Sequence, residues 1–220
     1  MKERPILFSG PMVRAILEGR KTQTRRIMKP QPTDAFLPEV GEYQRTLVDR
    51  KDGEQFPDPV VRFGASDEAE DYPCPYGQPG DRLWVRETWA PRGVNPVYRP
   101  DGKFGAAVIE YRADGTRATW NHDPIQRIKD DWRPSIFLPR WASRITLEVT
   151  AVRVERLQDI SENDAKAEGV ENANSFVGIG ADDDAANRYA YRELWESING
   201  AGSWAENPWV WVIEFRRVTP

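Results

Sequence analysis

Hydrophobic and polar residues alternate along residues 82–89 and 143–157, a pattern typical of β-strands that bury one face. Three further strands are expected at residues 6–8, 106–111 and 209–215, which are short and mostly apolar. In the stretch 82–89, Leu83, Val85, Glu87 and Trp89 fall on one face, and Trp84, Arg86 and Thr88 on the other. Either Glu87 or Arg86 must therefore share a face with large apolar side chains.

Helical spacing and end signals predict a first helix directly after the first strand. It opens at Ser9-Gly10-Pro11, where proline suits the first turn, and Gly19 marks its end. Its apolar residues Val13, Ile16 and Leu17 recur at i, i+3 and i+4, which gives the helix one buried face.

Two further helices are predicted between the last two strands. The first starts at Ser161, which forms a capping pair with Asp164, and ends at Gly169. The second covers about 184–198 and ends at Asn199-Gly200. Glu168 falls at the C-terminal turn of the shorter helix, where the helix dipole disfavours a carboxylate. We therefore expect a cationic partner for Glu168.

Residues 30–80 differ from the rest of the chain, because they carry eight prolines and show little periodicity. This pattern predicts a long, loop-rich insertion that contains one hairpin. Residues 106–111 precede the turn 113–115 and are expected to form one arm of another hairpin.

The chain has 220 residues, of which 39% are hydrophobic and 11% aromatic, so it can form one main domain with insertions. It contains no apolar run of the roughly 20 residues that a membrane helix needs, and no signal-peptide pattern at its N-terminus. We therefore expect a cytoplasmic protein without a membrane partner.

Cysteine and histidine counts restrict the chemistry further. Cys74 is the only thiol and His122 the only imidazole, which excludes an intrachain disulfide and a cysteine-cluster metal site. We expect no metal and no cofactor, and a surface-loop position for His122. Acid–base chemistry then falls to Lys, Glu, Asp, Tyr or water bound by Arg. Cys74 is either a packed or a reactive thiol.

Charge is distributed unevenly, although the net charge is only −4. Residues 1–30 hold eight basic and two acidic residues, whereas residues 51–80 and 159–187 have net charges of −5 and −7. A local basic patch can bind a polyanion even on an acidic protein, because salt screens distant charges. An ordinary solvated face remains the alternative interpretation.

Several motifs occur in an order that resembles the ASCH domain family, in its long bacteriophage and prophage form. The motifs are Gly19-Arg20-Lys21-Thr22 with Thr24 and Arg26, Gly80-Asp81, Pro139 to Arg144, Ser161 to Gly169, and Val212-Ile213-Glu214-Phe215. The resemblance covers about residues 4–30, 77–90 and 140–218. It implies an α+β, PUA-like mixed β-barrel with short helices at its ends. A single domain would then span 1–220, with long loop-rich insertions at about 31–76 and 91–133.

The same resemblance implies binding of RNA or a modified nucleoside. Some small members of the family are amidohydrolases that deacylate N-acetylated cytidine with a Lys, a Thr and a Glu. The matching residues here are Lys21, Thr24 and Glu168, and Arg26 matches a further arginine of the motif.

This chemistry is reasonable from the residues themselves. A lysine acts as a base when burial or cationic neighbours lower its pKa, and Arg20, Arg25 and Arg26 would be such neighbours. Glu168 would orient the Lys21 amine or pass a proton to the leaving amine, with Thr24 as nucleophile or water-holding group. The arginines would stabilise an oxyanion or grip a phosphate. A plain ion pair between Lys21 and Glu168 is the alternative.

Other residues are candidates for lining a nucleic-acid cleft, in which tryptophans would stack on bases and charged groups would read base edges or phosphates. They are Trp84, Arg86, Glu87, Arg140 and Arg144, with Trp89 and Trp141 open to the same interpretation. Ordinary salt bridges are the alternative for the charged members, and Trp209 and Trp211 are expected in the core. The function hypotheses are a nucleoside amidohydrolase, a non-catalytic RNA-binding module and, less supported because there is no second histidine, a ribonuclease.

Overall fold

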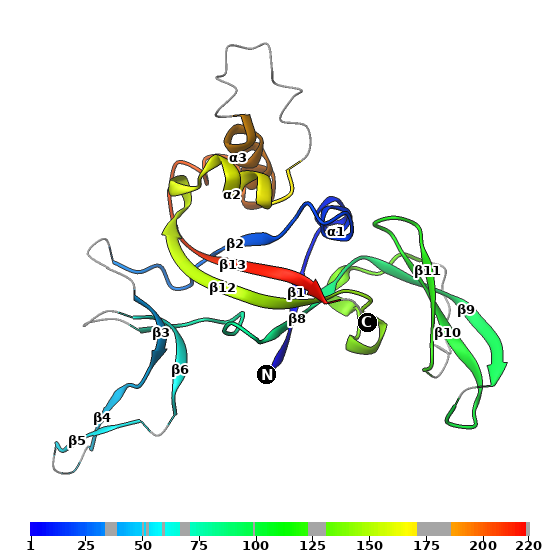
Figure 1. Cartoon of the computed structure of the whole chain (residues 1–220), viewed down its shortest axis with the longest axis horizontal. Coiled ribbons are helices and arrows are strands. Elements are labelled where there is room, and N and C mark those ends of the chain that lie inside the picture. Colours follow the sequence, from blue (N-terminus) through cyan, green and yellow to red (C-terminus); the bar gives the residue numbers. More distant parts are fainter. Residues whose placement is uncertain are drawn as a thin grey trace. The chain divides into compact units, whose positions relative to one another are not determined.

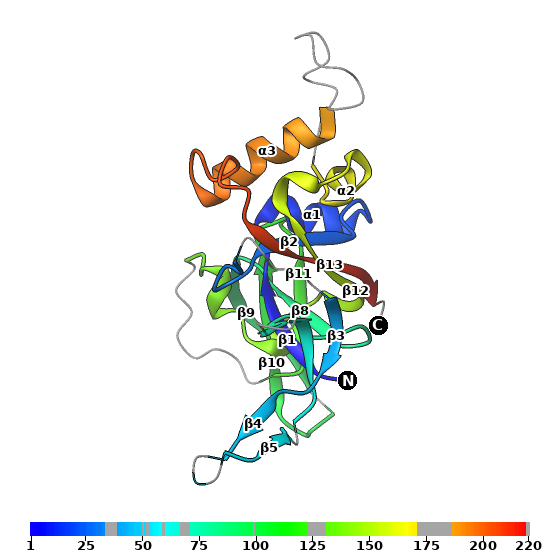
Figure 2. The same cartoon turned by 90° about the vertical axis from the view of Figure 1, so that its left-hand side faces the viewer.

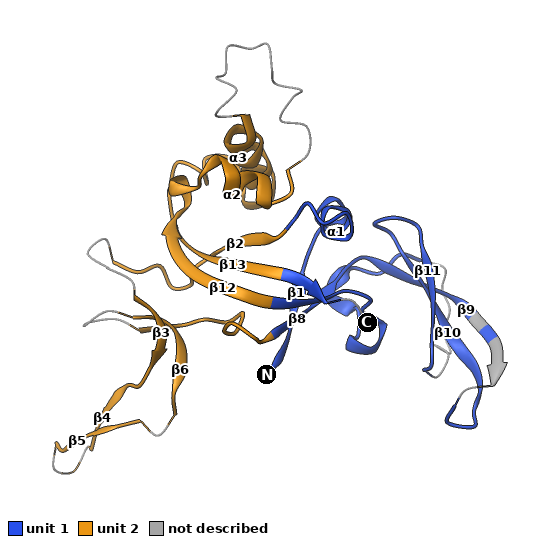
Figure 3. Ribbon diagram, viewed as in Figure 1, with its two compact units in different colours: residues 1–21, 82–148, 216–220 blue, residues 22–81, 149–215 orange. Residues whose placement is uncertain are grey.

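The computed structural model describes residues 1–33, 39–49, 51, 53–58, 60–66, 71–98, 100–122, 131–170 and 186–218. The chain divides into two compact units, each built from separate stretches of sequence (Figure 3). Unit 1 comprises Met1–Lys21, Arg82–Glu148 and Arg216–Pro220, and unit 2 comprises Thr22–Asp81 and Val149–Phe215.

Unit 1 begins with the sheet β1-β8-β12. Strand β1 (Glu3–Leu7) lies parallel to β8 (Arg82–Arg86), and the first residues of β12 (Thr146–Arg156) pair antiparallel to β8. Between β1 and β8 in the sequence lies helix α1 (Gly10–Leu17), which ends with Gly19 at φ 76°. The predicted start and glycine stop of this helix are therefore confirmed.

A second sheet of unit 1 has the strand order β11-β10-β9 (Figure 1). It consists of β9 (Trp89–Tyr98), β10 (Phe104–Tyr111) and β11 (Arg117–Trp120), and the predicted hairpin after 106–111 is confirmed by β10 and β11. The stretch 82–89 was predicted to be one strand, and this prediction is wrong. The stretch breaks at Glu87-Thr88, because β8 pairs with β1 and β12 whereas β9 pairs with β10. The segment 91–133 thus contains ordered strands rather than loops alone.

Unit 2 contains the sheet β12-β13-β2, in which β2 (Gln23–Ile27) pairs antiparallel with β13 (Trp209–Val218). Helices α2 (Glu162–Ala167) and α3 (Ala186–Asn199) lie beside one another in both views (Figures 1 and 2). Apolar side chains of both helices pack with Val210 and Val212 of β13. Both predicted helices are confirmed, although residues 184 and 185 of the second prediction lie outside the described residues. Trp211 is buried as expected, and Trp209 is half-buried.

The region between β2 and β8 contains more strands than the one hairpin predicted. A sheet of order β3-β6-β7 and a hairpin β4-β5 are present. The strands are β3 (Glu39–Tyr43), β4 (Thr46–Val48), β5 (Gln55–Pro57), β6 (Arg62–Ser66) and β7 (Asp71–Pro73). Gly64 permits the close pairing of β6 with β7, since a Cβ there would meet the Tyr72 carbonyl oxygen at 2.1 Å.

The described helices and sheets give an α+β protein, which confirms the predicted class. The described sheets are open, since β1 and β2 each have one neighbouring strand, and no closed barrel is seen among them. Within the described residues, no helix combines the length and the apolar character needed to cross a membrane.

Replacing the α2 cap tests the predicted start of that helix. The Ser161 Oγ accepts a hydrogen bond from the Asp164 backbone N–H at 3.0 Å and donates to the Asp164 carboxylate at 2.8 Å. Ser161→Ala should lower the free energy of unfolding by about 1 kcal/mol in urea denaturation. The control Ser197→Ala, at an exposed position in the last turn of α3, should cost less than about 0.5 kcal/mol. Equal losses would contradict the capping role.

Candidate functional site

A buried guanidinium lies at the centre of the charged cluster in unit 2. Arg25, on β2, has a fully buried side chain, and three carboxylates surround it. Its Nη2 lies 2.9 Å from Glu155 on β12 and 3.4 Å from Asp164 on α2, and its Nη1 lies 3.5 Å from Glu168. The expected cationic partner of Glu168 is therefore Arg25, and that prediction is confirmed.

A second arginine, Arg153 on β12, extends this cluster. It donates to Asp164 at 3.0 Å and makes further ion pairs with Glu155 and Glu214. Burial alone would raise the pKa of Asp164. Hydrogen bonds from Ser161 and Gln23, together with the Arg25 and Arg153 charges, instead hold this pKa below its ordinary value. Asp164 is thus an anion at neutral pH, with a cation on each side.

Backbone hydrogen bonds fix the start of β2 against the end of α2. The Thr22 N–H donates to the Ala167 carbonyl at 2.9 Å, and the Thr22 carbonyl accepts from the Phe215 N–H at 2.8 Å. The Gln23 side chain adds a 2.8 Å hydrogen bond to the Asp164 carbonyl oxygen. Glu168 directly follows Ala167, so its backbone lies next to the first residues of β2.

Tyr191 of α3 contributes a hydroxyl near the same carboxylate. Burial raises the pKa of Tyr191 well above the ordinary tyrosine value, and the Glu168 charge raises it further. The charges of Arg25 and Arg26 lower this pKa, but their effect is smaller. Tyr191 is therefore a neutral phenol at physiological pH. Sequence reasoning placed it nowhere in the site, because its stripe on α3 is typical of core residues.

The two faces of β2 carry different groups. Gln23 and Arg25 contact the α2 side, so strand alternation places Thr24 and Arg26 on the opposite face. The sequence grouped Arg25 with Arg26 as potential substrate ligands, but Arg25 is committed to buried ion pairs. Thr24 is buried, whereas Arg26 is half-buried.

Tyr76 is a residue near Arg26 that sequence reasoning missed. Burial raises its pKa, while the Arg26 charge acts on the hydroxyl in the opposite direction. Tyr76 therefore lies within electrostatic range of Arg26, beside the buried Cys74. It was missed because it belongs to the proline-rich stretch 30–80, where no periodic pattern singled it out.

Lys21 is the last residue of unit 1, one position before Thr22. It is only 2% exposed, and its ammonium lies 5.6 Å from the centre of the Phe8 ring. Its backbone N–H donates to Ala15, which closes the end of α1. Arg20, next to it, is exposed and pairs with Glu18.

Unit 1 contains a second buried ion pair, between Glu87 and Arg144. Both oxygens of Glu87 accept from Arg144 at 2.8 Å, and Arg144 also pairs with Asp114 at 2.8 Å. Burial raises the pKa of Glu87, against the lowering effect of Arg144. Arg144 also lies 4.2 Å from the centre of the Tyr111 ring. Glu87, rather than Arg86, is thus the charged residue among apolar groups.

Trp84 is buried, and two arginine side chains lie near its ring. Arg86 lies 4.6 Å and Arg140 6.0 Å from its ring, and Arg140 pairs with Glu3. These contacts match the alternative of salt bridges and cation–π pairs. Roles of Trp84, Arg86, Glu87, Arg140 and Arg144 in nucleic-acid binding stay predictions.

Three further residues considered in the sequence analysis are His122, Trp141 and Trp89. His122 is exposed, as expected, and stacks on Trp141 with ring centres 4.1 Å apart. Trp89 is buried in an apolar cluster of unit 1. In the described part of the chain, no group of three His, Cys, Asp or Glu side chains is arranged to hold a metal ion.

Comparison with protein-family models, with curated proteins and with solved structures gave no match. The candidate site is therefore the start of β2, where the backbone bond from Thr22 to Ala167 brings the strand next to the buried carboxylate of Glu168. A carboxylate held by an arginine can accept or orient a proton without a metal.

Replacing Arg25 should lower the free energy of unfolding by an amount that depends on pH. Arg25→Met removes this cation from the buried Glu168, whereas Glu155 and Asp164 keep Arg153, and it should lower the free energy of unfolding by about 3–5 kcal/mol at pH 7. A buried carboxylate that loses its cation is protonated more readily in the folded state than in the unfolded state. The loss in the free energy of unfolding should therefore become smaller as the pH falls from 7 to 5. In the unaltered protein the pKa of Asp164 is lowered, so its contribution persists above the ordinary value of 3.8 and is lost only below it.

The measurement is urea denaturation at both pH values. Arg192→Met is the matched control, because Arg192 forms an exposed 3.8 Å pair with Glu196 on α3. It should cost less than about 1 kcal/mol at either pH. A deficit for Arg25→Met that does not change with pH would contradict the description of this cluster.

Proposed function

We propose that the protein binds a modified nucleoside, alone or within RNA, and hydrolyses the amide bond of N-acylated cytidine. The substrate would lie at the start of β2, where the Lys21–Thr24 segment meets the residue before Glu168, and Lys21, Thr24 and Glu168 would carry the reaction. We further propose that the open sheets described above are parts of a PUA-like architecture, in line with the order of the ASCH-like motifs.

One observation carries this proposal: the backbone bond between Thr22 and Ala167 joins the Lys21–Thr24 segment to the residue before Glu168. These two segments are about 145 positions apart in the sequence, and the motif resemblance assigns the reactive groups to both. The bond is internal to unit 2, and Lys21 directly precedes it in the chain. A buried carboxylate next to this segment is what a metal-independent proton transfer needs.

The proposed roles follow from general amide chemistry. Lys21, as the neutral amine, takes a proton from a water molecule held by the Thr24 hydroxyl. The water oxygen bonds to the acyl carbon, and the bond from that carbon to the cytosine nitrogen breaks. The proton passes from Lys21 through the Glu168 carboxylate to the leaving nitrogen, so the products are the free carboxylic acid and cytidine, and both side chains return to their starting states. Lys21 is 2% exposed, so its side chain lies away from bulk water, as this assignment requires.

Arg26 and Tyr76 are proposed as the recognition pair. A tyrosine ring can stack on a base, a contact worth about 1–3 kcal/mol, and an arginine can donate to a carbonyl or phosphate oxygen. Both residues lie in unit 2, and the Arg26 charge acts on the Tyr76 hydroxyl. Their contribution would be to binding, whereas Lys21 and Glu168 would act on the rate.

The test is turnover of N-acetylated cytidine, followed by its change in absorbance. Lys21→Ala and Glu168→Gln should each lower kcat by about 100-fold or more, because each removes a proton-transfer group. Lys166→Ala is the matched control, since this exposed lysine lies two positions from Glu168 on α2. It should leave kcat within twofold of the unaltered protein.

Absence of turnover in the unaltered protein would overturn the enzymatic part of the proposal. An RNA-binding module would remain if the protein binds single-stranded RNA with an affinity that falls with salt. In that case Arg26→Gln should weaken binding and reduce the salt slope by about 1. Loss of turnover in Lys166→Ala equal to that in Lys21→Ala would also contradict the assignment.

A further inference from the structure

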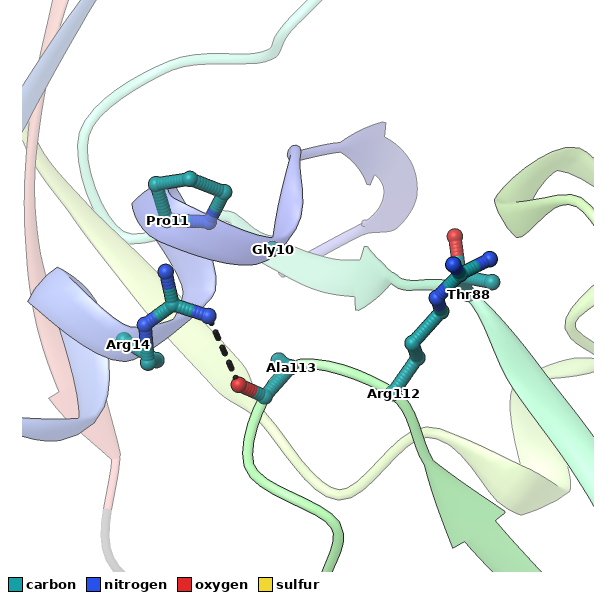
Figure 4. Close-up of a pocket in the computed structure, with 6 residues that line it drawn as sticks. All are labelled: Gly10, Pro11, Arg14, Thr88, Arg112 and Ala113. Atoms are coloured by element: carbon teal, nitrogen blue, oxygen red, sulfur yellow. Dashed lines mark hydrogen bonds between the residues drawn. The ribbon is translucent and has the colours of Figure 1, made fainter.

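Unit 1 contains a cavity that the proposed function does not use. It has a volume of about 340 Å³ and is lined by Gly10, Pro11, Arg14, Thr88, Arg112 and Ala113 (Figure 4). All six residues belong to unit 1. The volume is at the lower end of the range for small-molecule sites and exceeds what a single inorganic phosphate needs.

The lining of this cavity is cationic. Arg14 comes from α1, and Arg112 from the segment after β10 (Figure 4). No acidic residue lines the cavity, and neither arginine forms an ion pair with a carboxylate of the described residues. This contrasts with Arg25, Arg144 and Arg153, which carboxylates hold in place. Two guanidinium groups without acidic partners leave positive charge available to an anion.

Both arginines are nevertheless positioned by other contacts. Arg14 donates from Nη1 to the Ala113 carbonyl oxygen at 2.8 Å, which leaves its other donors available. The Arg112 guanidinium lies 5.7 Å from the Trp132 ring centre, and its backbone N–H donates to the Thr88 carbonyl at 2.9 Å. Positioned side chains lose less conformational entropy when they bind a ligand.

We propose that this cavity binds a phosphate group attached to a sugar, with Arg14 and Arg112 as the anion ligands and the Thr88 hydroxyl as a further hydrogen-bonding group. Arginine suits this role because its planar donors match two oxygens of one phosphate. The first turn of α1, at Gly10 and Pro11, adds a dipole of favourable sign. The remaining volume accommodates the sugar. The phosphate is either a terminal monoester or a diester within a nucleic-acid strand.

The test uses isothermal titration calorimetry on the full chain, with ribose 5-phosphate and a single-stranded RNA hexamer as probes and ribose as the uncharged control. Ribose 5-phosphate has no base, so it does not report on the proposed nucleoside site. Arg14→Gln and Arg112→Gln should each weaken binding at least tenfold. Arg117→Gln, an exposed arginine of the same unit outside the cavity, should leave the Kd within twofold.

The two probes distinguish the source of the phosphate. Tighter binding of ribose 5-phosphate would identify a monoester, and tighter, salt-sensitive binding of the hexamer would identify a strand phosphate. The proposal is overturned if neither probe binds at millimolar concentration, if ribose binds as well as its phosphate, or if Arg117→Gln weakens binding as much as Arg112→Gln. Lys21→Ala should not change the Kd for ribose 5-phosphate, so this site can fail or succeed independently of the amidohydrolase.

Discussion

The fold of unit 2 depends on how one buried cation is neutralised. Moving an arginine and its carboxylate partners out of water costs several kcal/mol per ion, and the cost is recovered only when the partners meet in good geometry. The Arg25 charge is neutralised by Glu155, Asp164 and Glu168, which come from β12, α2 and the residue that caps α2. The strand and the helix must therefore come together before this charge is neutralised.

The same constraint explains why Glu168 is placed where a helix dipole disfavours it. The Arg25 charge compensates for the unfavourable C-terminal position, and the backbone bond from Thr22 holds the end of α2 next to β2. Unit 1 uses a similar arrangement for Glu87, with Arg144 as its partner. In both units a buried carboxylate is acceptable because one specific arginine reaches it.

Local signals in the sequence predicted much of this architecture. Alternation located β8 and β12, and mostly apolar stretches located β10 and β13. The glycine after α1 marked its end, and Ser161 marked the start of α2. These features depend on neighbours within a few residues, and the need of Glu168 for a cation follows from helix physics alone. The sequence alone therefore predicted that Glu168 has a cationic partner.

The identity of that partner could not be predicted, because Arg25 and Glu168 are 143 positions apart. The break at Glu87-Thr88 was missed for the same reason: it reflects a change of pairing partner from β12 to β10, which alternation along one strand does not encode. The region between β2 and β8 lacks a periodic pattern and is rich in proline, so no sequence pattern indicated a role for Tyr76. Sorting Arg25 and Arg26 onto opposite faces of β2 required the observed contacts with α2.

A double-mutant cycle between Arg25 and Glu168 tests the central claim most directly. The free energies of unfolding of Arg25→Met, Glu168→Gln and the double variant would be measured at pH 7 in urea. The account predicts a coupling energy of about 1–3 kcal/mol, because each side chain satisfies the other in a buried site. A coupling energy that cannot be distinguished from zero would contradict it, since Glu168 would then gain its stability from another group.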